Sequence, residues 1–134
     1  MNIQNFEDLL QAARTQPVKQ RLLFVFVDAE LPDDASAAQR ADFEAGQGGA
    51  LVPLMCVDKD PHDLTSFGSL VQEAAQFGHA WRFVFAGALS GSAKGAPNPE
   101  IVETSLQAMV ESIKRGEMSR YLAFDRQGSP VVLG

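Results

Sequence analysis

The feature that most constrains this 134-residue sequence is an unbroken apolar run from Leu22 to Val27. Successive side chains of a strand point to opposite faces, so a run without polar positions predicts a strand buried on both sides. A second run, from Trp81 to Leu89, is apolar throughout after Arg82. Both runs predict a sheet with helices packed on it. Four phenylalanines are expected at the centre of its core: Phe24, Phe26, Phe83 and Phe85.

Helical patterns alternate with these strands. One helix is predicted from a cap at Asn5 to about Thr15, and a short Ala-rich helix ends near Ala45. A third helix follows a cap at Asp63 or Thr65. The longest helix begins at Pro99 and Glu100, which suit a first helical turn, and Gly116 stops it.

Two further strand segments complete the pattern. Ala50 to Val57 is apolar but contains Pro53, which removes a ladder donor and predicts an edge position, or pairing only beyond the proline. The tail from Tyr121 to Leu133 predicts a β-hairpin with its turn at residues 125–128. The fold class is therefore α/β or α+β: one domain, 1–134, with a mixed sheet of about five strands and a C-terminal hairpin.

The pairing of the first two strands is open at this point. A helix between them favours a parallel crossover. The helix is short, however, and glycines from Gly46 to Gly49 follow it. The two strands could instead form an antiparallel pair with a long connection.

Charge and cysteine content exclude several functions. Cys56 is the sole cysteine, so neither an internal disulfide nor cysteine-ligated zinc is available. The net charge is −6, and nine acids against two bases between Asp28 and Asp63 disfavour nucleic-acid binding. The first ten residues resemble neither a signal peptide nor a membrane anchor, so no membrane association and a cytoplasmic location are expected. No cofactor or metal is predicted.

Two loops carry the candidate ligand-binding residues. Asp58, Lys59 and His62 follow the second strand, and Ser90 and Lys94 follow the third. Loops after strands commonly hold ligands in α/β proteins, and a glycine-rich loop with a lysine can bind an anion. The alternative is that the first loop caps the next helix and the second is a solvated surface loop. Cys56 lies in an apolar run, which favours a core residue over a reactive thiolate.

Three segments carry a family resemblance: residues 20–26, 48–59 and 124–128. Across nearly its whole length the chain resembles a small bacterial family of uncharacterised proteins that are often labelled ribonucleotide reductase subunit alpha. Catalysis of that reaction needs a thiyl radical and a redox-active cysteine pair inside a large barrel. One cysteine in 134 residues excludes the catalytic subunit. A shorter segment, residues 51–55 followed by Leu64 and Phe67, is similar to the serine-sensitivity-enhancing B proteins.

The sequence contains no recognisable combination of a nucleophile, a general base and a general acid that would indicate catalysis. The first functional hypothesis is accordingly a non-catalytic binding or interaction module that forms a homodimer. Residues 121–124 and 131–133 of the hairpin are its candidate free edges, which natural proteins cover or pair. The alternative is a small enzyme, or a protein that binds an anion or small molecule, with its site in the two loops. That alternative requires both loops to reach the same end of the sheet.

Overall fold

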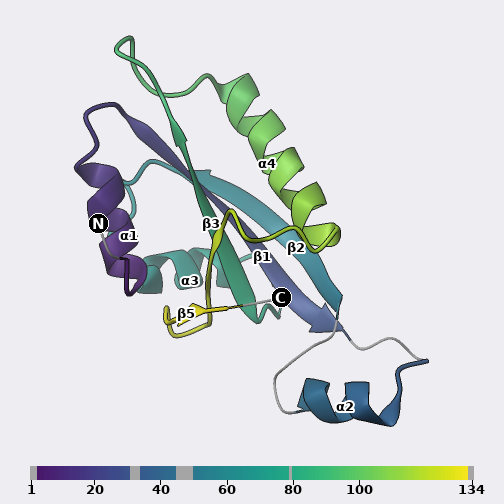
Figure 1. Ribbon diagram of the computed structural model, residues 1–134. Helices are drawn as coiled ribbons and strands as arrows, with labels where there is room; N and C mark the ends of the chain where they lie inside the picture. Colours follow the sequence, from purple (N-terminus) through teal and green to yellow (C-terminus); the bar gives the residue numbers. More distant parts are fainter. Residues whose placement is uncertain (1–2, 31–33, 45–49, 79, 133–134) are drawn as a thin grey trace.

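The computed structural model describes residues 3–30, 34–44, 50–78 and 80–132, so Gly46–Gly49 and Leu133 lie outside the described residues. A five-stranded sheet and four helices make up the described chain, and its C-terminal hairpin is present as predicted (Figure 1). The helices are α1 (Phe6–Arg14), α2 (Ala37–Glu44), α3 (Phe67–Ala75) and α4 (Pro99–Lys114). The strands are β1 (Gln20–Glu30), β2 (Ala50–Lys59), β3 (Phe83–Ser90), β4 (Leu122–Phe124) and β5 (Pro130–Val131).

The strand order is β2-β1-β3-β4-β5, and each neighbouring pair in the described sheet is antiparallel. The antiparallel alternative for the first two strands is therefore the one adopted. Because β2 and β3 both run antiparallel to β1, they run parallel to each other on its two sides. The connection through α3 passes over β1, and β4 and β5 extend the sheet beyond β3.

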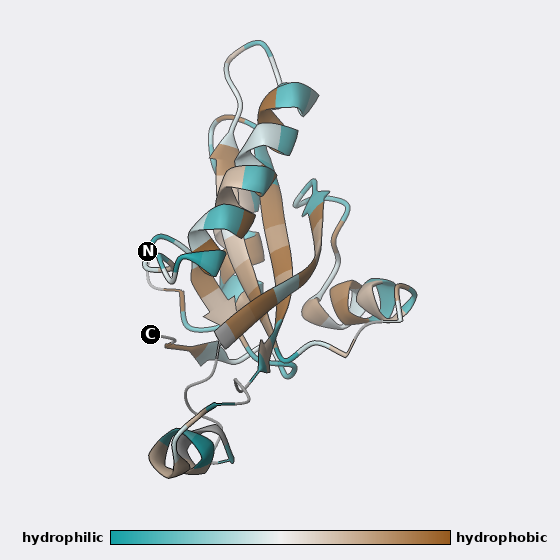
Figure 2. Cartoon of the chain, turned by 90° about the vertical axis from the view of Figure 1, so that its right-hand side faces the viewer, coloured by the Kyte–Doolittle hydropathy of each residue, from teal (hydrophilic) through white to brown (hydrophobic). Residues whose placement is uncertain are grey.

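Helices cover both faces of this sheet, and β1 separates two cores. Leu22, Phe24 and Phe26 face α1 and α3, whereas the alternate residues of β1 face α4. Figure 1 shows α1 and α3 on one side of the strands and α4 on the other, and Figure 2 shows that the strands are largely apolar. Three of the four expected core phenylalanines are fully buried, while Phe83 is only half-buried at the start of β3.

Aromatic packing fixes α1 on the sheet. The Phe6 ring centroid lies 4.9 Å from that of Phe67, 5.5 Å from Phe124 and 5.8 Å from Phe24. Edge-on and tilted arrangements at these distances are favourable beyond the area they bury. One residue of α1 thus joins the helix to α3, to β1 and to β4.

Local chemistry sets the helix ends. The Asn5 side chain accepts a hydrogen bond from the Asp8 N–H at 2.9 Å, as the predicted cap requires. The helix predicted to start at Asp63 or Thr65 is instead capped by Ser66, whose hydroxyl accepts from the Ser69 N–H at 3.1 Å. Asp63 takes part in the preceding turn, where its N–H donates to the Asp60 carbonyl at 3.0 Å.

Pro53 lies on an edge strand, as its missing N–H predicts. Val27 pairs with Pro53 and Phe26 pairs with Met55, so Leu54 is an extra residue in the register. A bulge beside an edge proline is a common way to accommodate the lost ladder bond. None of the helices in the described segments is both long and apolar enough to cross a membrane.

Candidate functional site

The loops after β2 and β3 reach the same end of the sheet. Lys59, the last residue of β2, lies opposite Leu22, and Ser90, the last residue of β3, lies opposite Gln20. Since Gln20 begins β1, both loops flank the start of the central strand. This is the arrangement that a shared loop site requires.

Asp58 and Lys59 point to opposite faces at that end. Asp58 Oδ2 lies 2.6 Å from the Nε of Arg21. Arg21 is two residues before Leu23, so its side chain lies on the same face of the sheet, which α4 covers. Lys59 forms an ion pair with Glu73 of α3 on the other face. The two side chains are thus separated by the sheet and are engaged with different partners.

Ser90 and Lys94 are also kept apart. The Gln20 side-chain Nε2 donates a hydrogen bond to Ser90 Oγ at 2.9 Å, on the face of α1. Lys94 is exposed in a tight turn in which Ser92 and Gly95 form an isolated bridge. That loop extends past the end of the sheet (Figure 1).

His62 lies in a loop that its own backbone and α1 hold in place. Asp60 Oδ1 accepts from the His62 N–H at 2.9 Å, and Arg14 of α1 donates to the carbonyls of Pro61, at 2.9 Å, and Leu64. A hollow of about 100 Å³ separates the loop from the start of β1. Among the described residues, no three His, Cys, Asp or Glu side chains are grouped closely enough to hold a metal ion. The hydrogen bonds from Arg14 and to Asp60 are those of a turn that is anchored to α1.

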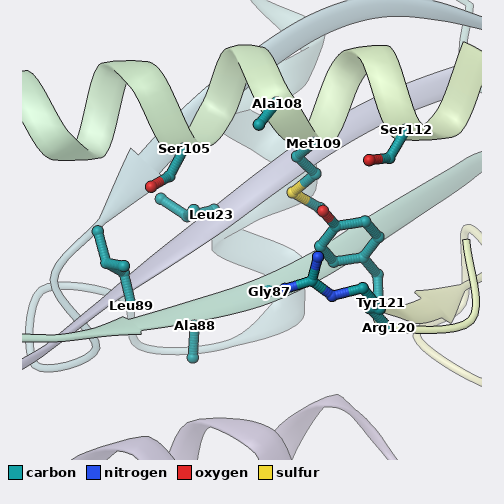
Figure 3. Close-up of a pocket in the computed structure, with 10 residues that line it drawn as sticks. All are labelled: Leu23, Gly87, Ala88, Leu89, Ser105, Ala108, Met109, Ser112, Arg120 and Tyr121. Atoms are coloured by element: carbon teal, nitrogen blue, oxygen red, sulfur yellow. The ribbon is translucent and has the colours of Figure 1, made fainter.

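A larger hollow, which the sequence analysis missed, lies on the other face between α4 and the sheet. Figure 3 shows the residues that line it, and its volume is about 200 Å³. Gly87 of β3 was its one sequence signal, because an isolated glycine inside an apolar strand indicates close approach of another group. The group is Tyr121: a Cβ on Gly87 would lie 3.3 Å from Cδ1 of its ring. We name this hollow the α4 pocket, and it is lined by Leu23, Gly87, Ala88, Leu89, Ser105, Ala108, Met109, Ser112, Arg120 and Tyr121.

The outer edge of β2 is the second surface feature. No strand of the described chain pairs with this side of β2, and residues 51–60 are all half-buried. A groove of about 230 Å³ runs between this edge and α4. Its lining is mostly apolar: Pro53, Leu54, Met55, Cys56, Gln107 and Val110. Of the two edges predicted in the hairpin, the one at residues 121–124 is wrong, because β4 is paired on both sides, with β3 and with β5. Val131 does lie on an edge strand, the two-residue β5, at the opposite side of the sheet from β2.

Cys56 lies in this groove and packs against the core under α4. Partial burial raises the pKa of its thiol, and the negative charges of Glu103 and Asp58 raise it further. Because the thiolate is the reactive form, these surroundings keep the sulfur protonated and unreactive at neutral pH.

The α4 pocket, the β2 edge and the loop end of the sheet are therefore three separate surfaces. Comparison with protein-family models, with curated proteins and with solved structures finds no match for this chain. The resemblance to the small bacterial family stays a prediction.

Proposed function

We propose that this protein is a non-catalytic interaction module that forms a homodimer by pairing β2 of one copy with β2 of another. The observation that carries the proposal is the ten-residue β2, whose outer side is unpaired within the described chain. Long apolar edges promote association, and natural proteins cover, charge or pair them. Pairing with a second copy would extend the sheet across both molecules.

The charge distribution favours a second copy as the partner. The net charge of −6 would keep two molecules apart over most of their surfaces. Residues 50–57 carry no charge, so identical strands can meet there without repulsion. At the end of the strand, Asp58 and Lys59 are already paired internally, with Arg21 and Glu73 respectively.

Geometry limits the register of such a pair. The bulge at Leu54 and the missing N–H of Pro53 interrupt regular pairing in the first half of β2. Regular strand remains from residue 55 to 59. A two-fold axis perpendicular to the sheet places a residue opposite its own copy. An axis at Val57 pairs residue 55 of each copy with residue 59 of the other and uses only this regular segment, whereas an axis at Met55 or Cys56 would bring Leu54 or Pro53 into the pairing.

The groove beside β2 supports the same arrangement. It is open, mostly apolar, and continuous with the unpaired edge between Pro53 and Cys56. A second strand laid along the edge would cover it, while α4 of each copy would remain on the same face. Two-fold pairing also creates no further free edge at this side of either molecule.

Sedimentation velocity between about 1 and 100 μM tests the association, and single-cysteine cross-linking tests the register. Cys56 serves in the unaltered chain, and Met55→Cys and Val57→Cys are each made in a Cys56→Ser background. Disulfide formation needs Cα atoms within about 7 Å, so oxidation at alkaline pH, where the Cys56 thiolate forms, should yield dimer strongly at one of the three positions. Ala75→Cys in the same background is the control for random collision, since Ala75 is exposed at the end of α3.

Leu54→Lys should shift the sedimentation coefficient to that of a monomer, whereas Ile101→Lys should leave the dimer intact. Ile101 is 55% exposed on α4, away from the β2 edge. Melting curves of both variants show whether each is still folded, and so distinguish a folded monomer from an unfolded chain. A monomer at every concentration, or equal cross-linking at all three strand positions and at residue 75, would overturn the proposal.

A second candidate function is binding of an anion or small molecule by the loops after β2 and β3, which share one end of the sheet. In this alternative a ligand would draw Lys94 toward Asp58 on the α4 face, since Ser90 lies on the α1 face. A thermal-shift screen with the unaltered protein tests it. Any ligand found should lose its stabilising effect in the Asp58→Ala/Lys94→Ala double variant, while the ligand-free melting temperature changes little. Retention of the effect would exclude this site.

A further inference from the structure

The α4 pocket is open because small residues line it from both sides. Ser105, Ala108 and Ser112 lie at successive turns of α4 and do not fill the space above the sheet. Below them, Gly87 provides no side chain, which lets the Tyr121 ring lie close to β3. A Cβ on Gly87 would also lie 3.8 Å from Met109 Sδ. The hollow is therefore built into the packing of three elements.

The two ends of the pocket differ in chemistry. Figure 3 shows Leu23, Leu89 and Ser105 at one end, and Ser112, Arg120 and Tyr121 at the other. Met109 and Gly87 lie between the two ends. One end is thus mainly apolar, and the other combines a guanidinium with two hydroxyl groups.

Arg120 differs from the two cations at the C-terminal end of α4. Lys114 Nζ lies 3.5 Å from Glu111 Oε1, and Arg115 Nε lies 3.2 Å from Glu117 Oε2. Arg120 has no acidic partner among the described residues, and the lining of the pocket contains no carboxylate. Its guanidinium can therefore pair with an anion inside the pocket.

We propose that the α4 pocket binds a small organic monocarboxylate. The carboxylate would accept from Arg120, with Ser112 and Tyr121 as further donors, and the hydrocarbon part would pack against Leu23 and Met109. A guanidinium matches a carboxylate in a two-bond geometry. The inference concerns a different surface from the β2 edge and does not depend on dimer formation.

Charge and size favour a carboxylate over a phosphate. A phosphate dianion needs several donors or cations, whereas the described lining offers one cation. The pocket also lies beside the C-terminal end of α4, where the helix dipole opposes a dianion more strongly than a monoanion. At about 200 Å³ the pocket has the volume of roughly six or seven water molecules, taking about 30 Å³ for each. A short-chain acid matches this volume, and a drug-sized ligand does not.

Tyr121 makes the site directly observable, because it is the only tyrosine of the sequence. Its ring signals can be followed by proton NMR during titration with acetate, butyrate, hexanoate and decanoate. Butyrate or hexanoate should shift these signals saturably and bind more tightly than acetate, which leaves the apolar end empty. Decanoate should bind more weakly because it exceeds the pocket. Hexanamide, the neutral analogue, and inorganic phosphate should produce little shift.

Arg120→Gln should weaken butyrate or hexanoate binding by about tenfold to a hundredfold, as expected for loss of a hydrogen-bonded charge. Arg115→Gln is the matched control, since Arg115 is nearby but paired with Glu117, and it should change the affinity less than about twofold. The Tyr121 signals of each variant without ligand report whether the pocket is intact.

Four results would overturn the proposal: no saturable shift up to about 10 mM acid, equal binding of phosphate, equal binding of hexanamide, or unchanged affinity in Arg120→Gln. Loss of binding in Arg120→Gln with an unshifted ligand-free spectrum would support it. If Arg120→Gln disturbs the ligand-free spectrum, Arg120→Lys provides the second reading. It keeps the charge, and it should retain part of the affinity while losing the two-bond geometry.

Discussion

Arg21 and Asp58 join the two longest strands of the sheet: Arg21 Nε lies 2.6 Å from Asp58 Oδ2 across the β1–β2 pair. The side chains are 34% and 33% exposed, so water and salt screen their attraction. Asp58→Asn is therefore expected to lower the free energy of unfolding by less than about 1 kcal/mol. Urea denaturation at low salt and at 0.5 M NaCl measures it, and the loss should shrink at high salt. A cost several times larger would show that the pair is central to the sheet.

Cys56 should react with iodoacetamide only at alkaline pH. Burial, Glu103 and Asp58 raise the pKa of its thiol, so the rate should reach its midpoint at a higher pH than for a free cysteine peptide. Glu103→Gln should lower that midpoint, whereas Glu100→Gln, earlier on the same helix, should not. A raised pKa also means that the folded state holds this proton more tightly. The associated stability is present below the pKa of the unfolded chain and is lost as the pH rises through the folded one. Coincident midpoints for Glu103→Gln and the unaltered protein would contradict the assigned cause.

Gly128 and Gly116 allow backbone strain to be separated from side-chain crowding. Both have positive φ, +81° and +77°, which a side chain disfavours. A Cβ at Gly128 would lie 3.1 Å from the Phe67 ring, whereas at Gly116 nothing lies within 4 Å. Gly116→Ala should cost about 1 kcal/mol from the backbone alone. Gly128→Ala should cost about 2–3 kcal/mol and perturb the Phe67 ring. If chemical denaturation gave the same loss of unfolding free energy for both variants, the Phe67 ring would have moved aside without an energetic cost.

Phe6 should be among the most sensitive positions of the fold. Its ring packs against Phe24, Phe67 and Phe124, and it is 1% exposed. Phe6→Ala is expected to cost about 3–5 kcal/mol, through lost apolar burial and an unfilled cavity. The control is Phe77→Ala, because Phe77 is 55% exposed, and its cost should stay below about 0.5 kcal/mol. Calorimetric melting of both variants is the measurement. A small loss for Phe6→Ala would mean that α1 contributes little to the folded state.

Features that depend on neighbouring residues could be predicted from the sequence. The Asn5 cap, the start of α4 at Pro99 and the hairpin turn at Asp125–Gly128 each follow from local hydrogen bonding and backbone preference. The edge position of β2 followed from one missing N–H at Pro53. Such signals lie within a few residues of the structure they specify.

Features assembled from distant segments could not be predicted. The placement of β3 beside β1 depends on the path through α3, which the sequence pattern leaves open. The predicted site treated Asp58 and Lys59 as neighbours, yet adjacent strand residues point to opposite faces. The α4 pocket needs Gly87, Ser112 and Tyr121 from three separate segments of the chain, and of these only the glycine was unusual in its local context.

The division of β1 between two cores has a consequence for changes in chain length. Deletion of one residue between Leu22 and Val27 would turn every later side chain of the strand to the opposite face of the sheet. Phenylalanines that pack against α1 and α3 would then lie under α4, in space that valines fill. Valines would lie under α1 and α3, in space that phenylalanines fill. A substitution in this segment harms one layer in proportion to its size, but an insertion or deletion displaces both layers at once. We expect β1 to tolerate variation in its apolar side chains far better than variation in their number.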